Sequence, residues 1–146
     1  MAFNFFFSLE KVLKVRNIRE DKALNQFVQA RNKEKKIQNK LQNKISEQKD
    51  LYKYIRNNDL PPETAFYTRN CIFSKRKKIN NVQEQLSAQK MEVKKCKQEF
   101  IEKRKKREAI DKLKEKEIKS FTKKFHQKEQ KELDDIAQHL NSEPGV

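Results

Sequence analysis

The feature that most constrains this 146-residue sequence is its single glycine, Gly145. Phosphate-binding loops, nucleophile turns and oxyanion turns need glycine where the backbone passes close to a ligand or takes a positive φ angle. Hydrophobic residues make up 34% of the chain and charged residues 39%, which is too little apolar content for a globular enzyme. Leu, Ile, Val and Phe nevertheless recur regularly, and such burial can offset the entropy of ordering. The sequence therefore predicts a non-enzymatic, all-α protein of long amphipathic helices.

Helix-breaking signals are concentrated at one place, the stretch from Asn57 to Pro62. Proline removes a backbone donor and restricts the residue before it, so a helix that reaches this stretch should end there. Asp59 and the two prolines also suit the start of a second helix. The prediction is a single coiled-coil domain over residues 1–146, a two-helix antiparallel hairpin. Its parts are a helix at about 8–57, a hinge at about 58–62, a helix at about 63–140 and a frayed tail at 141–146.

A 3-4 alternation of mostly apolar residues runs along both predicted helices and predicts a heptad seam. It begins at Phe6 and continues to Ile55 in the first helix. In the second helix it runs from Ala65 to Ile110. There, polar residues interrupt it at Thr68, Lys75, Gln89, Lys103 and Arg107. The predicted seam includes Phe27, Ile37, Leu41, Leu86, Val93 and Phe100.

The second predicted helix is longer than the first. In a hairpin with equal arms from a hinge near residue 60, residue i lies opposite roughly residue 120 minus i. Leu51 would then face the turn of Ile72, and Leu13 the turn of Arg107. Residues beyond about 115 would have no partner on the first helix, so the second helix should overhang at the termini end. The apolar spacing also changes phase after Ile110, which implies a change of winding or of partner.

Positive charge is concentrated in the two predicted helices. Residues 8–57 contain 14 basic and 6 acidic residues, and residues 75–124 contain 19 and 8, whereas residues 125–146 carry a net charge of −3. Such a body could attract nucleic acid, an anionic membrane surface or an acidic protein. Contiguous basic runs at 75–78 and 103–107 surround a helix rather than forming one reading face, and no nucleic-acid-binding module is present. A solvated coiled-coil flank is therefore favoured over an acidic partner, and specific nucleic acid is least favoured.

Neither a metal site nor a cofactor is predicted. His126 and His139 lie thirteen residues apart and belong to no ligand motif. Cys71 and Cys96 would be too far apart on one helix for a disulfide, so two free thiols suggest a reducing compartment. The apolar opening, residues 1–7, lacks a basic region and is too short for a leader or a membrane span. The sequence predicts a cytosolic protein with no transmembrane segment.

Aromatic residues gather in two places. At the hinge they either cap the open end of the hairpin or form a tip that docks on a partner. At the other end they are expected to plug the hairpin locally, near Phe121 and Phe125. The hinge group is Tyr52, Tyr54, Phe66, Tyr67 and Phe73, and the terminal group is Phe3, Phe5, Phe6 and Phe7.

The stretch from Phe7 to Arg16, F-S-L-E-K-V-L-K-V-R, resembles the opening of the flagellar export protein FliJ family, which has an F-x-L-E-K-V-L-x-x-R-like start. The stretch from Glu129 to Ala137 is similar to that family's ending. The resemblance implies a stalk-like coiled coil of the bacterial flagellar type III export apparatus, similar to the central stalk of rotary ATPases. It implies as partners the export ATPase hexamer and its regulator, the membrane export-gate protein and export chaperones. The location implied is cytoplasmic, peripheral to the inner membrane at the flagellar base.

The resemblance also implies two sets of contact residues. The ATPase ring would be contacted by Phe7, Leu9, Leu13, Arg16, Phe121, Phe125, Leu133 and Ile136. The export gate would be contacted at the hinge half by Leu51, Tyr52, Ile55, Phe73 and Ile79. Two alternatives stay open: the equivalent stalk of a virulence-type secretion system, and a basic coiled-coil nucleic-acid or scaffold protein.

Overall fold

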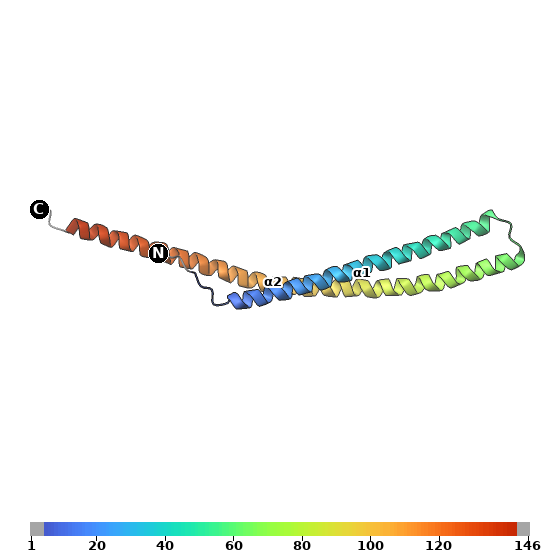
Figure 1. The fold of residues 1–146 in the computed structure, drawn as a ribbon, viewed down its shortest axis with the longest axis horizontal. Coiled ribbons are helices and arrows are strands. Elements are labelled where there is room, and N and C mark those ends of the chain that lie inside the picture. Colours follow the sequence, from blue (N-terminus) through green and yellow to red (C-terminus); the bar gives the residue numbers. More distant parts are fainter. Residues whose placement is uncertain (1–4, 143–146) are drawn as a thin grey trace. The chain divides into compact units, whose positions relative to one another are not determined.

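The computed structural model describes residues 5–142, which fold into two long helices and no strand (Figure 1). Helix α1 spans Glu10–Asn57 and helix α2 spans Pro62–Ser142. The two helices pack against each other in opposite directions, so the predicted all-α hairpin is confirmed. The connection between them is residues 58–61.

The hinge forms where the prolines require it. Asn58 closes the end of α1, since its Nδ2 donates to the carbonyl oxygen of Tyr54 at 3.1 Å. Pro62 is the first residue of α2, the position at which a missing backbone donor costs nothing. The carbonyl oxygen of Pro61 accepts the first bond of that helix, from the N–H of Ala65 at 2.9 Å. One short segment therefore ends one helix and starts the other.

The 3-4 alternation marks the residues that the helices place between them. Every position of the alternation from Leu9 to Ile55 in α1, and from Ala65 to Ile110 in α2, is buried or half-buried. Within the described residues no large side chain is completely buried, because a pair of helices has only one packed face. The core is therefore a single line of side chains along the contact between α1 and α2. Its buried apolar residues are Phe7, Leu13, Ala23, Ala30, Ile72, Ile79, Val82, Cys96 and Ile110.

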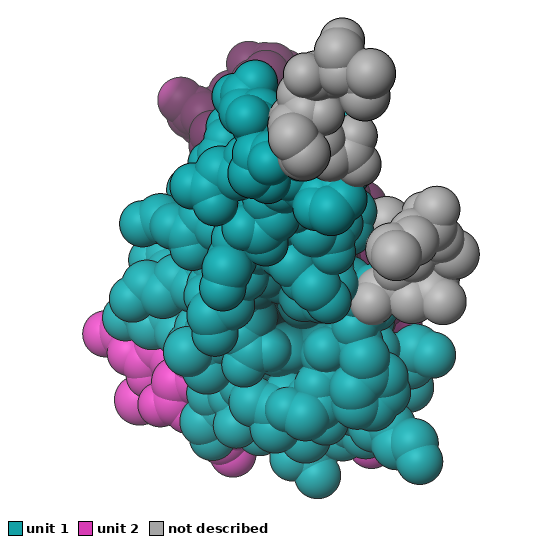
Figure 2. Space-filling model, turned by 90° about the vertical axis from the view of Figure 1, so that its left-hand side faces the viewer, with its two compact units in different colours: residues 1–20, 103–146 teal, residues 21–102 magenta. Residues whose placement is uncertain are grey.

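The chain divides into two compact units, coloured separately in Figure 2. Unit 2 is residues 21–102 and contains the hinge with the adjoining parts of both helices. Unit 1 is residues 1–20 with residues 103–146 and contains the start of α1 and the long C-terminal part of α2. No helix in residues 5–142 combines the length and the apolar content needed to cross a bilayer.

In unit 1, α2 continues well past the start of α1 (Figure 1). The ion pair between Lys114 Nζ and Glu10 Oε2, at 2.9 Å, joins α2 to the first residue of α1. From residue 126 to residue 142 every side chain is exposed. This C-terminal segment is helical up to Ser142, and residues 143–146 of the predicted tail lie outside the described residues.

Candidate functional site

Unit 1 has a small apolar cluster where the chain enters α1. Phe7, Leu13 and Ile110 are its buried members, and Phe5 and Leu9 pack against them. The predicted plug of phenylalanines is present in part. Phe5 makes an edge-to-face contact with Phe121, with ring centroids 5.6 Å apart. Phe3 lies outside the described residues.

Phe6 does not occupy the seam, although the 3-4 alternation assigns it there. Its side chain is 84% exposed, while that of Phe7 is 4% exposed. The physical reason is that α1 begins only at Glu10, so residues 5–9 do not follow helical spacing. The N–H of Glu10 bonds to the carbonyl oxygen of Phe7 at 3.2 Å, and this turn directs Phe7 inward. The expectation that the seam begins at Phe6 is wrong.

The eight residues predicted to contact an ATPase ring fall into three groups by exposure. Phe7 and Leu13 are buried in the apolar cluster, so they can support a contact surface but cannot form one. Leu133 and Ile136 are exposed on the C-terminal segment of α2. The half-buried members are Leu9, Arg16, Phe121 and Phe125.

Exposed apolar residues on the start of α1 were missed by the sequence reasoning. Val12, Val15 and Ile18 lie outside the seam and are exposed. Their spacing of three residues keeps them on one side of the helix over this short stretch. The signal was present in the sequence as apolar residues at positions where the alternation requires polar ones. They give the start of α1 an exposed apolar side, and Phe6, just before the helix, is exposed as well.

The C-terminal segment of α2 carries its own apolar stripe. Leu133, Ile136 and Leu140 are spaced three and four residues apart, so they lie on the same face of the helix. All three are exposed, at 57–66%. An exposed apolar stripe on a polar helix is typical of a surface that another protein covers.

The hinge half, in unit 2, presents aromatic rather than aliphatic residues. Of the residues predicted to contact an export gate, Tyr52 and Phe73 are exposed, Leu51 and Ile55 are half-buried and Ile79 is buried. The full exposed group, here called the aromatic tip, is Tyr52, Tyr54, Phe66, Tyr67 and Phe73.

All five side chains of the aromatic tip are exposed. Their recorded ring contacts are local. Phe66 and Tyr67 meet edge-to-face at 6.2 Å, and Lys77 Nζ lies 5.0 Å from the centre of the Phe73 ring. Their exposure favours the docking interpretation over the capping one.

Polar residues at seam positions of unit 2 find partners across it. Gln89 Nε2 donates to the carbonyl oxygen of Ala30 at 2.9 Å. Lys75 Nζ donates to Glu47 Oε2 at 2.7 Å. That hydrogen bond, together with the positive charge of Lys75, lowers the pKa of the Glu47 carboxyl. These pairs fix the register of the two helices.

In unit 1 the seam contains a charge network centred on Arg107. Its Nε donates to Glu20 Oε2 at 2.5 Å, and its Nη1 donates to Asp111 Oδ2 at 2.6 Å. The hydrogen bond to Glu20, followed by the one to Asp111, raises the pKa of the guanidinium. The pattern of residue types alone did not reveal the contact with Glu20, because that acid lies on the other helix.

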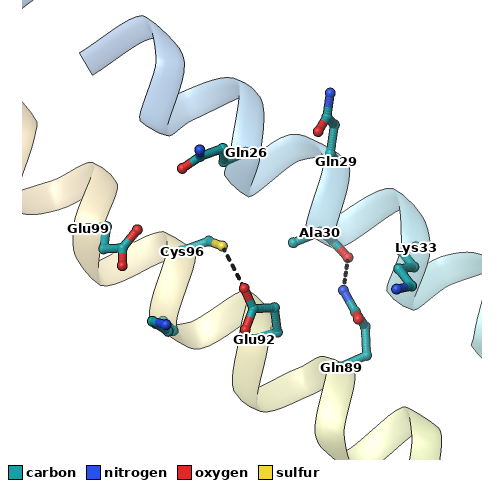
Figure 3. Close-up of a pocket in the computed structure, with 9 residues that line it drawn as sticks. Gln26, Gln29, Ala30, Lys33, Gln89, Glu92, Cys96 and Glu99 are labelled. Atoms are coloured by element: carbon teal, nitrogen blue, oxygen red, sulfur yellow. Dashed lines mark hydrogen bonds between the residues drawn. The ribbon is translucent and has the colours of Figure 1, made fainter. Parts of the chain in front are cut away.

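The seam of unit 2 is open at a polar pocket, drawn in Figure 3. Its lining includes Gln26, Lys33, Glu92 and the buried thiol of Cys96. Burial, and next the hydrogen bond that the thiol donates to Glu92 at 3.6 Å, raise the pKa of Cys96. A raised pKa disfavours the thiolate, so this cysteine is a packing residue rather than a nucleophile.

No candidate metal site is present in the part of the chain that the structure describes. No group of three or more His, Cys, Asp or Glu side chains is arranged there to hold an ion. His126 lies near its helix neighbour Glu129, with Nδ1 3.7 Å from Oε2, and its ring meets that of Phe125 edge-to-face.

Comparison with known proteins assigns the chain to a family. A family model described as flagellar FliJ protein matches residues 5–145, nearly the whole chain. This chain belongs to the FliJ family. It is therefore a protein associated with flagellar export, and the family is a non-enzymatic export component. No curated protein and no solved structure matches it.

Proposed function

We propose that this FliJ-family chain is a stalk-like, non-catalytic component of the bacterial flagellar type III export apparatus. It binds the ring of the export ATPase with its termini end and the membrane export gate with its aromatic tip, and it also engages export chaperones. It works in the cytoplasm, peripheral to the inner membrane at the flagellar base. The observation that carries the proposal is the family match over residues 5–145. Because the matching family is the flagellar one, we favour this stalk over its virulence-system equivalent.

The proposed ring contact is supported by the exposed apolar residues of unit 1. Phe6, Val12, Val15 and Ile18 provide apolar area at the start of α1. The exposed stripe of the C-terminal segment provides more, through Leu133, Ile136 and Leu140. Buried residues such as Leu13 act in this proposal by holding the start of α1 against α2.

The proposed gate contact is supported by the aromatic tip. Tyr and Phe side chains supply large contact areas with few rotatable bonds, so they are frequent anchors of protein interfaces. Tyr52 and Phe73 are exposed and belong to the predicted gate contact. Tyr54, Phe66 and Tyr67 extend it.

The proposed mechanism is allosteric. A two-helix stalk lacks the rotational symmetry of a ring, so it contacts ring subunits unequally. Unequal contacts stabilise different conformations in different subunits, which couples the stalk to nucleotide turnover in its partner. The chain itself supplies contacts and no chemistry in this scheme.

ATP turnover by the cognate export ATPase tests the ring contact. We expect the full chain to stimulate turnover at moderate salt, and Leu133→Ser/Ile136→Ser to lose most of the stimulation. The matched control is Val28→Ser/Met91→Ser, which removes two exposed apolar side chains of unit 2. Both variants must retain the helicity of the parent chain by circular dichroism. Equal stimulation by the parent and both variants would contradict the proposed contact.

Cell motility tests the flagellar assignment. Deletion of the gene should abolish or strongly reduce swimming, and expression of the chain from a plasmid should restore it. The variant Tyr67→Ser/Phe73→Ser should restore swimming poorly if the aromatic tip engages the gate. Normal swimming without the gene would reject the flagellar role. Salt-sensitive DNA binding combined with no ATPase binding would instead support the basic scaffold protein.

A further inference from the structure

Four basic side chains line one pocket in unit 1. Arg16 and Arg19 come from α1, and Lys103 and Lys106 come from α2. Each pair is spaced three residues apart, so both members lie on the same face of their helix. The pocket encloses about 110 Å³, and no acidic side chain contributes to its lining.

Three neighbouring basic residues of unit 1 have carboxylate partners, whereas these four have none within the described residues. Lys114 pairs with Glu10, Arg107 with Glu20 and Asp111, and Arg104 with Glu108. Within the described residues, Arg16 Nη1 donates a hydrogen bond to the backbone carbonyl oxygen of Lys106 at 2.8 Å, which leaves its charge without a carboxylate. Arg19, Lys103 and Lys106 have no side-chain partner there. The pocket is thus a place where positive charge is not neutralised.

Packing does not account for these residues. Arg16 and Lys103 are half-buried and occupy seam positions, where apolar side chains would stabilise the helix pair. Like charges spaced three residues apart on a helix, or facing one another across a seam, destabilise it. The arrangement costs stability in the empty chain, and a bound anion would remove that cost.

We propose that this pocket binds a phosphate group. Lys and Arg are the side chains that bind phosphate oxygens, and Arg can do so with two parallel hydrogen bonds. A water molecule occupies about 30 Å³ of liquid, so the pocket has room for one tetrahedral oxyanion. Four positive charges favour a multiply charged phosphate over a halide ion. The rest of the phosphate-bearing molecule would extend into solvent.

A nucleic-acid backbone fits this region less well than a single phosphate group. Binding a strand requires a continuous basic track along the surface. Here the positive charge is interrupted on α2 by Arg107 and Lys114, both of which are already paired with acids. The pocket instead gathers four unpaired basic side chains, from both helices, around one point.

Thermal unfolding and calorimetry with inorganic pyrophosphate test the proposal on the full chain. Pyrophosphate should raise the melting temperature above its value in sodium chloride of equal ionic strength, because a ligand that binds only the folded state stabilises it. Arg19→Gln/Lys106→Gln should weaken pyrophosphate binding at least about tenfold. The matched control, Lys14→Gln/Lys105→Gln, changes two exposed lysines outside the pocket and should bind like the parent.

Three further results complete the test. Without ligand, the pocket variant should melt at a higher temperature than the control variant, since it loses like-charge repulsion. Equal weakening of pyrophosphate binding in both variants would overturn the proposal, because the effect would then follow total charge.

Binding to vesicles of phosphatidylcholine with phosphatidylglycerol is the second arm of the experiment. Pocket-dependent vesicle binding without pyrophosphate binding would identify a lipid headgroup as the source of the phosphate, and no pocket-dependent binding in either arm would reject the site. Neither arm contains the ATPase, so the outcome is independent of the proposed stalk function.

Discussion

At the scale of single residues, Gln89 is the polar side chain that most clearly fixes the seam. It is buried, and its hydrogen bond to Ala30 O crosses between the helices at 2.9 Å. Gln89→Ala removes that bond and leaves a small gap, so we expect the free energy of unfolding to fall by about 1–2 kcal/mol. Urea denaturation followed by circular dichroism measures the change. Gln85→Ala, at an exposed position of the same helix, should stay within about 0.5 kcal/mol of the parent. Equal losses in the two variants would mean that the bond contributes nothing.

The two cysteines should differ in reactivity. Cys71 is exposed, whereas Cys96 is buried and has a raised pKa because of its burial and its hydrogen bond to Glu92. Since the thiolate is the reactive form, we expect a disulfide reagent at pH 8 to modify Cys96 at least about tenfold more slowly than Cys71. The rate at Cys96 should rise with pH as the thiolate fraction grows. Single-cysteine variants, Cys71→Ser and Cys96→Ser, separate the two reactions, and similar rates in folded protein would contradict the burial of Cys96.

At the scale of helices, the hairpin could be predicted from the sequence because the residues that signal the helix ends and the seam are also their physical cause. Pro61 and Pro62 end one helix and start the next, and the 3-4 alternation names the residues that lie between the two. The alternation fails at Phe6, where the chain is not yet helical. It also could not reveal that Glu20 pairs with Arg107 across the helices. The contact surfaces stayed predictions, since exposure selects among apolar residues but does not name a partner.

The register of the hairpin follows from the direction of helical side chains. A hinge near residue 60 predicts that residue i faces roughly residue 120 minus i, and Gln89 meets Ala30 close to that rule. Phe27 stacks on Phe100, which lies about two turns further along α2 than the rule predicts. Side chains lean toward the N-terminus of their own helix, so α1 side chains lean away from the hinge and α2 side chains toward it. Pairs of long side chains therefore join residues further from the hinge than backbone levels alone suggest.

The two ends of unit 1 should contribute unequally to stability. Residues 126–142 are all exposed, so a chain ending at Phe125 should melt within a few degrees of the full chain. Removing residues 1–9 deletes Phe5, Phe7 and Leu9 from the apolar cluster and should lower the melting temperature clearly more. Circular dichroism at 222 nm measures both truncations. A large loss on removing the C-terminal segment would show that this segment packs on the rest of the chain.

At the scale of the whole molecule, charge sets the response to salt. The chain carries a net charge of +15, and within each unit the two basic helices pack against one another. Repulsion between them acts over about 30 Å at 0.01 M salt and about 8 Å at 0.15 M. We therefore expect the melting temperature to rise from 0.01 to 0.15 M sodium chloride, although screening also weakens pairs such as Glu20 with Arg107. Both double-glutamine variants should show smaller rises than the parent, and the pocket variant the smaller of the two, because it also loses the local repulsion between the pocket side chains. A melting temperature that falls with salt would mean that the ion pairs outweigh the repulsion.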